Sequence, residues 1–172
     1  MRIAIDMDDV IADCVGGFLN WYERDFGVKL SPGALRDKTI FDVVPPAHAA
    51  KVRQYANTRG FFRQLATIDD SQPILRELNE KYDFYIVTLA TEFKYSLEEK
   101  HDWLEEHFPF ISWKKWVFCG DKSIIRADVM IDDNENNLRN FQGRKIMFSA
   151  PHNASQRAFE KVDNWEQLRA LL

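Results

Sequence analysis

The stretch Arg2-Ile-Ala-Ile-Asp-Met-Asp-Asp-Val-Ile-Ala-Asp13 decides how the rest of the chain is interpreted. Its short apolar run, Ile3 to Ile5, is typical of a buried strand and leads directly into Asp6, Asp8 and Asp9. A buried parallel strand delivers the residues after it to the carboxyl edge of a sheet, where α/β folds place ligands. Crowded carboxylates repel one another, so we expect a cation there, and oxygen ligands favour Mg²⁺ over zinc. An acidic, solvated turn is the alternative.

The composition indicates one globular domain, with room for an inserted subdomain. Of 172 residues, 45% are hydrophobic and 13% aromatic, which is enough to bury a core. The net charge of −4 argues against a nucleic-acid polymer as partner. No apolar run approaches the roughly 20 residues that cross a bilayer, and the N-terminus is unlike a signal peptide. Cys14 and Cys119 form no disulfide pattern, so we expect a cytoplasmic protein without membrane contact.

The chain alternates short apolar runs with helical patterns. Strands are predicted at 3–5, 84–88, 116–119, 128–132 and 145–148, and helices around 74–78, at 96–107, 137–141 and 165–172. Ser96 and Glu99 have the spacing of a capping box at the start of the second of these helices. The alternation predicts an α/β fold, a Rossmann-like parallel sheet of about five strands flanked by helices.

A small helical insertion is expected after the first strand. Asp13 is a candidate N-cap for a helix that Gly27 ends, residues 29–46 are predicted to be irregular, and a second helix is predicted at 47–57. We therefore predict a core of residues 1–14 and 68–172 with a helical cap subdomain of residues 15–67.

Later strand ends supply further polar groups. Thr88 ends the second strand, Asp132 and Asp133 end the fourth, and Lys122 lies in the loop before it. In a parallel sheet these groups meet at one edge. The set suits phosphoryl transfer, in which catalysis is largely positioning and charge stabilisation, with a carboxylate as nucleophile and a cation and a lysine shielding the phosphate.

These motifs, in this order, resemble the haloacid dehalogenase superfamily of phosphatases, and the similarity is closer to its 5'(3')-deoxyribonucleotidases. The resemblance extends over nearly the whole chain and is weakest between Gly27 and Gly60. The similar segments are Asp6 to Asp13 with Gly16-Gly-Phe-Leu19, Phe93-Lys-Tyr-Ser with Glu99-Lys and Trp103, Asp121-Lys-Ser, Ala127 to Asp133, and Ala150-Pro-His-Asn153.

The resemblance implies roles for the acidic residues. Asp6 would be the nucleophile, and Asp8 would protonate the leaving oxygen and then activate water. Mg²⁺ would be bound by the carboxylates of Asp6 and Asp132 and the main-chain carbonyl of Asp8. Asp133 would lie near the metal without binding it directly. Asp9, where glycine is common, is expected to point away from the site.

The resemblance also implies roles for residues that bind substrate. Thr88 and Lys122 would hold phosphate oxygens, while the cap closes over the site. Phe41 and Tyr55 stand nearest to the aromatic residues that contact the base, and Phe18 is a further candidate. Cys14 stands where a base-contacting phenylalanine is frequent, and Lys94 is a candidate phosphate ligand. For these five cap and loop positions the alternatives are ordinary core packing or, for Lys94, a solvated surface lysine.

The resulting prediction is a Mg²⁺-dependent phosphatase, monomer or homodimer, that hydrolyses deoxyribonucleoside 5'(3')-monophosphates through an aspartyl-phosphate. The alternative within the same chemistry is another small phosphomonoester as substrate. A phospho-accepting receiver domain fits less well, because its phosphorylated Asp precedes its Thr and Lys, whereas Asp132 and Asp133 follow both here. A catalytically silent binding protein is disfavoured, since no expected catalytic position is lost.

Overall fold

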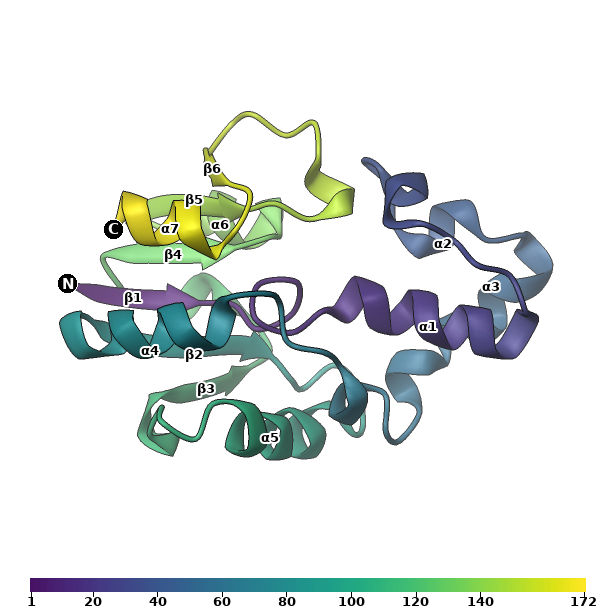
Figure 1. Ribbon diagram of the computed structural model, residues 1–172, viewed down its shortest axis with the longest axis horizontal. Helices are drawn as coiled ribbons and strands as arrows, with labels where there is room; N and C mark the ends of the chain where they lie inside the picture. The colour runs from purple at the N-terminus through teal and green to yellow at the C-terminus, as the bar shows by residue number, and fades with distance from the viewer.

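The computed structural model describes residues 1–172 and contains one six-stranded sheet whose strands are all parallel. The strand order is β3-β2-β1-β4-β5-β6, so the N-terminal strand lies in the interior of the sheet (Figure 1). The strands are β1 (Arg2–Ile5), β2 (Asp83–Leu89), β3 (Trp116–Cys119), β4 (Val129–Asp132), β5 (Arg144–Phe148) and β6 (Glu160–Val162). The predicted α/β sheet is confirmed. The sixth strand was not predicted, because Glu160-Lys-Val is too short and polar to form an apolar run.

The register of the sheet brings the strand ends to one edge. Ile5 of β1 pairs with Ile86 of β2 on one side and with Ile131 of β4 on the other. The amide of Asp6 then donates to the carbonyl of Ile131 at 2.9 Å. Residues that follow β1 and end β4 therefore lie side by side.

Two helical layers cover the sheet. The larger core joins the β1 side chains Ile3 and Ile5 to the apolar faces of α4 (Ser71–Lys81), α5 (Ser96–His107) and α7 (Trp165–Leu171). Ala4 points to the opposite face, which is covered by the short helix α6 (Glu135–Asn140) and Phe141. This alternation follows from the two-residue period of a strand. None of the helices combines the length and the apolar composition needed to span a bilayer.

The segment between β1 and α4 lies beyond the carboxyl ends of the strands (Figure 1). It contains α1 (Cys14–Phe26), η1 (Pro32–Leu35), α2 (Ile40–Val43), α3 (Pro46–Arg53), η2 (Tyr55–Asn57) and η3 (Phe62–Gln64). Aromatic rings form its core: Phe61 lies 4.6 Å from Phe18 and 5.3 Å from Trp21 between ring centroids. The division into a core and a cap subdomain stays a prediction.

The helix boundaries in this segment follow local capping chemistry. Asp13 accepts a hydrogen bond from the Gly16 amide, and Gly27 ends α1 with a φ of 66°, as predicted. Two expectations were wrong. The region predicted to be irregular contains α2, whose first turn is closed by Thr39 donating to Asp42. The helix predicted at 47–57 stops at Arg53 and gives way to the separate turn η2.

The predicted capping box at Ser96 and Glu99 is also wrong. Tyr95 is the N-cap of α5, and the Ser96 hydroxyl has no partner. The buried Glu99 carboxylate instead accepts hydrogen bonds from the amides of Gly60, Phe62 and Arg63. Three amide donors in one bend stabilise the carboxylate more than the single amide of a cap, so Glu99 ties the inserted segment to α5.

We expect Glu99→Ala to lower the free energy of unfolding by at least about 2 kcal/mol, because buried amides lose a charged acceptor. The matched control is Glu98→Ala, which removes only an exposed pair with Arg59 and should leave the unfolding midpoint unchanged. Urea denaturation of both variants measures the difference. Equal losses in the two variants would contradict the role of Glu99.

Candidate active site

Asp6 is the first residue after β1 and is buried at the carboxyl edge of the sheet. Its Oδ1 accepts a hydrogen bond from the Met7 amide at 2.7 Å and contacts the Nζ of Lys122 at 2.5 Å. Burial raises the pKa of Asp6 to about 7, with repulsion from Asp132 adding to the rise and the Lys122 ammonium opposing it. The site therefore holds Asp6 as a carboxylate only with the help of positive charge.

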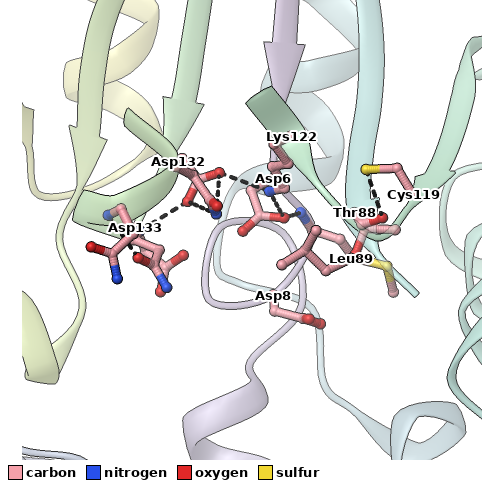
Figure 2. A network of polar contacts seen from close by, with 12 residues as sticks. Asp6, Asp8, Thr88, Leu89, Cys119, Lys122, Asp132 and Asp133 are labelled. Atoms are coloured by element: carbon pink, nitrogen blue, oxygen red, sulfur yellow. Dashed lines mark hydrogen bonds and ion pairs between the residues drawn. The ribbon is translucent and has the colours of Figure 1, made fainter. Parts of the chain in front are cut away.

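Lys122 lies in η5 (Lys122–Ile124), and its side chain is 1% exposed. Its ammonium bridges the Oδ1 of Asp6 and the Oδ2 of Asp132, the latter at 2.7 Å (Figure 2). Burial alone would lower the pKa of Lys122, but the two carboxylates outweigh it and raise that pKa above its usual range. This lysine is a fixed positive charge between the two strand-end carboxylates.

Asp132 and Asp133 are held by the segments that follow β4 and β5. Asp132 accepts hydrogen bonds from the Asn134 amide at 2.9 Å and from the side chain of Asn137 at 3.1 Å. Asp133 contacts the Nε2 of His152 at 3.1 Å. Burial raises the pKa of both carboxyl groups, and Lys122 and His152 respectively oppose the rise.

These acidic residues have the donor chemistry of a site for a hard cation. One carboxylate oxygen from each of Asp6, Asp132 and Asp133 lies within 4.8 Å of the others. The main-chain carbonyl of Asp8 accepts no hydrogen bond from the protein, so it is free to act as a ligand. Oxygen ligands, with no cysteine among them, fit Mg²⁺. A divalent cation here would offset the repulsion between the buried carboxylates.

Asp8 lies lower on the loop after β1, and its side chain points away from Asp132 and Asp133 (Figure 2). Its Oδ2 accepts a hydrogen bond from the Nζ of Lys100 at 2.5 Å. The same ammonium donates to the Thr88 hydroxyl and to the Leu89 carbonyl, both at 2.9 Å. A residue that sequence analysis did not select therefore connects Asp8 and Thr88.

A signal for Lys100 was present in the sequence of α5. The buried positions of this helix are 96, 99, 100, 103 and 104, which is the spacing of an inward-facing stripe. Trp103 and Leu104 define that stripe, and Lys100 stands on it although a lysine is rarely buried without a partner. A charged residue on an apolar stripe indicates an internal acceptor, here the Asp8 carboxylate.

Asp9 does not point away from the site, contrary to expectation. Its backbone is left-handed, with a φ of 55°, and its Oδ1 accepts a hydrogen bond from the Val15 amide at 2.8 Å. Its carboxylate lies within 4.8 Å of ligand atoms of Asp133 and His152. The turn therefore directs Asp9 toward the β4 end of the site, and burial, followed by Asp133, raises its pKa well above the usual range.

An apolar pocket of about 150 Å³ adjoins these residues. Three of the predicted substrate-binding residues line it, namely Cys14, Phe18 and Phe41, together with Asp9, Lys38 and His152. The pocket therefore adjoins the carboxylate cluster, because ligand atoms of Asp9 and His152 lie within 4.8 Å of Asp133. Burial raises the pKa of the Cys14 thiol well above its usual range, so Cys14 contributes a small neutral wall.

Two predicted substrate-binding residues lie elsewhere. Tyr55 is buried behind Phe18, with its hydroxyl donating to the Trp21 carbonyl at 3.3 Å, and does not line the pocket. Lys94 is exposed, and its Nζ lies 5.3 Å from the centre of the Tyr95 ring. These placements match core packing for the tyrosine and a surface position for the lysine.

Comparisons with known proteins agree with this geometry. The family profile described as "5' nucleotidase, deoxy (Pyrimidine), cytosolic type C protein" matches residues 1–172. The 5'(3')-deoxyribonucleotidase of Bacillus subtilis is 40% identical over 182 residues, covering 99% of this chain and 97% of that protein.

Solved structures show the same fold at low sequence identity. A haloacid dehalogenase-like hydrolase of Streptococcus pneumoniae superimposes with a TM-score of 0.61 and 12% identity, covering 99% of this chain and 97% of that chain. The HAD-hydrolase YfnB of Bacillus subtilis, solved with bound magnesium, superimposes with a TM-score of 0.62 and 16% identity over the same shares of the two chains.

We expect Lys122→Met to destabilise the metal-free protein by about 3 kcal/mol or more, because it leaves two buried carboxylates side by side without a counter-charge. Lys81→Met, which removes an exposed helical pair with Glu77, is the control and should leave the unfolding midpoint unchanged. Denaturation in EDTA measures both. Adding Asp132→Asn to Lys122→Met should recover part of the loss, and the absence of any such coupling would contradict the bridging role.

Proposed function

The chain belongs to the 5'(3')-deoxyribonucleotidase family of haloacid dehalogenase-type hydrolases, and we propose that it hydrolyses deoxyribonucleoside 5'- and 3'-monophosphates through an aspartyl-phosphate. One observation carries the proposal: Asp9 and His152, which line the same pocket as the aromatic residues Phe18 and Phe41, also lie against Asp133 of the carboxylate cluster. A phosphate held by the carboxylate site thereby places an attached nucleoside against apolar side chains.

In the first step, an oxygen of Asp6 attacks phosphorus as the bond from phosphorus to the nucleoside oxygen breaks. Asp8 supplies the proton that the leaving oxygen takes up. In the second step, Asp8 removes a proton from water, which attacks phosphorus and releases Asp6 and inorganic phosphate. Asp8 lies on the same loop as Asp6 but points elsewhere, which suits a residue that acts on the leaving group and on water.

Two lysines supply fixed positive charge in these steps. Lys122 uses two of its N–H groups on Asp6 and Asp132, and its third can bind a phosphate oxygen. Lys100 donates its three N–H groups to Asp8, Thr88 and Leu89. It is therefore a positioning residue that orients the Asp8 carboxylate and the Thr88 hydroxyl.

The metal that these residues would hold is Mg²⁺, bound by the carboxylates of Asp6 and Asp132 and the carbonyl of Asp8, with Asp133 close by. When bound, Mg²⁺ neutralises negative charge on the phosphate and the nucleophile. His152 contacts the Asp133 carboxylate and the Asn153 side chain donates to the Asp133 carbonyl, which fixes the β4 end of the site.

We expect dUMP and dTMP to be hydrolysed with a kcat/KM at least about tenfold above that of sugar phosphates, because base stacking on aromatic side chains adds binding energy. EDTA should abolish turnover, and added Mg²⁺ should restore it. The variant Asp6→Asn removes the proposed nucleophile. Its kcat should fall by at least about 10³-fold while the protein remains folded. If sugar phosphates were hydrolysed with the same kcat/KM as the nucleotides, the assignment of a nucleotide substrate would be wrong. If the Asp6→Asn variant were active, the assignment of Asp6 as nucleophile would be wrong.

We expect Lys100→Met to lower kcat by about 100-fold with little change in KM, because Asp8 loses the donor that orients it. The pH dependence of kcat should change as well, which a purely structural role would not produce. Lys94→Met is the matched control on the adjacent surface and should stay within about twofold of the unaltered protein. A Lys100→Met enzyme with an unchanged pH profile and kcat would contradict this role.

A further inference from the structure

A second concavity, of about 620 Å³, lies beside the segment that connects β5 and β6. Its walls come from three parts of the chain: Arg36 after η1, Ser149 and Pro151 after β5, and Arg157, Lys161 and Asp163 around β6. The volume falls within the range of about 300–1,000 Å³ that small-molecule sites occupy. It is therefore large enough for an organic anion.

The charge of this concavity is opposite to that of the whole chain. The chain carries a net charge of −4, yet three cations line the concavity, Arg36, Arg157 and Lys161. Its one acidic lining residue, Asp163, already accepts a hydrogen bond from the Ser149 hydroxyl at 2.5 Å. The other nearby carboxylate, Asp37, accepts from the amide and the hydroxyl of Ser155.

The three cations are not neutralised by close ion pairs. Arg36 lies 3.9 Å from its only carboxylate, Asp37. Arg157 binds main-chain carbonyls through Nη1 and leaves Nε and Nη2 without a protein acceptor. Lys161 donates only to the carbonyls of Asn153 and Ala154. Burial and then the charge of Arg157 lower the pKa of Lys161, and the carboxylates of Asp163 and Asp37 oppose that fall without reversing it.

We propose that this concavity binds the polyphosphate group of a small molecule. Phosphate oxygens are acceptors for arginine forks and lysine ammonium groups, and several linked phosphates offer acceptors to all three cations that line the concavity. The ligand class differs from the monophosphates of the proposed function, and binding here does not use the carboxylate site.

The concavity and the carboxylate site share one loop. In η6 (Pro151–Asn153), His152 and Asn153 contact Asp133 on one side. On the other side, the Asn153 carbonyl accepts from Lys161, and the Pro151 carbonyl accepts from the Asp37 amide. A polyphosphate in the concavity would therefore contact the loop that fixes Asp133 and the segment next to Arg36.

Isothermal titration calorimetry of the protein with tripolyphosphate, in EDTA and at low salt, tests the site. We expect Arg36→Gln and Arg157→Gln each to weaken binding by about fivefold, and the double variant by about the product of the two. Arg139→Gln is the matched control, because it removes an equal charge from an exposed position on α6 and should leave binding unchanged. Titration with dTTP shows whether a nucleoside adds to the affinity of the phosphate chain.

Each result has a definite reading. Selective weakening in the Arg36 and Arg157 variants supports the site, with a nucleotide as ligand if dTTP binds more tightly and a free polyphosphate if it does not. No binding by the unaltered protein at millimolar tripolyphosphate overturns the proposal. So does equal binding by all variants, which would assign the anion to the lysines of the carboxylate site. None of these outcomes depends on phosphatase activity.

Discussion

Mutual repulsion among buried carboxylates is the constraint on which the rest of this structure depends. Parallel strands β1 and β4 end side by side, so Asp6 and Asp132 are forced together in a region with little water. Lys122 bridges them, and it reaches that position because η5 returns the chain over the strand ends. One lysine cannot neutralise three acids, which is why the same edge has the donor set of a divalent cation site.

A second buried lysine joins the inserted helical segment to this edge. Glu99 and Lys100 are neighbours on α5, and they face different partners. Glu99 accepts hydrogen bonds from the amides of Gly60, Phe62 and Arg63. The Nζ of Lys100 instead lies 4.9 Å from the centre of the Phe62 ring and donates to Asp8. The position of the Asp8 carboxylate is thus tied to the end of the insertion. A displacement of that segment would alter the support of Asp8 before it altered Asp6.

The sequence predicted what local patterns determine and missed what only the fold determines. Five strands, the caps of α1, and the meeting of Asp6, Lys122 and Asp132 at one edge follow from apolar runs and parallel topology. The hydrogen-bond donors to Glu99 could not be predicted. The local sequence favours a cap at the start of α5, whereas in the fold the carboxylate accepts from amides that lie 36 to 39 residues away in the chain. Tyr55 was ambiguous for a related reason: in a small aromatic insertion, pocket lining and core packing have the same spacing, and the tertiary contacts decide.

The left-handed turn at Asp9 shows how a departure from the family pattern is accommodated. Glycine would adopt a φ of 55° without strain, and an aspartate there must gain compensating contacts. The Val15 amide supplies one at the start of α1, and the protonated form of His152, whose pKa Asp133 raises, supplies favourable charge. Asp9 consequently lines the apolar pocket and also lies against Asp133 of the carboxylate cluster. The residue at this turn therefore shapes both the carboxylate cluster and the apolar pocket beside it.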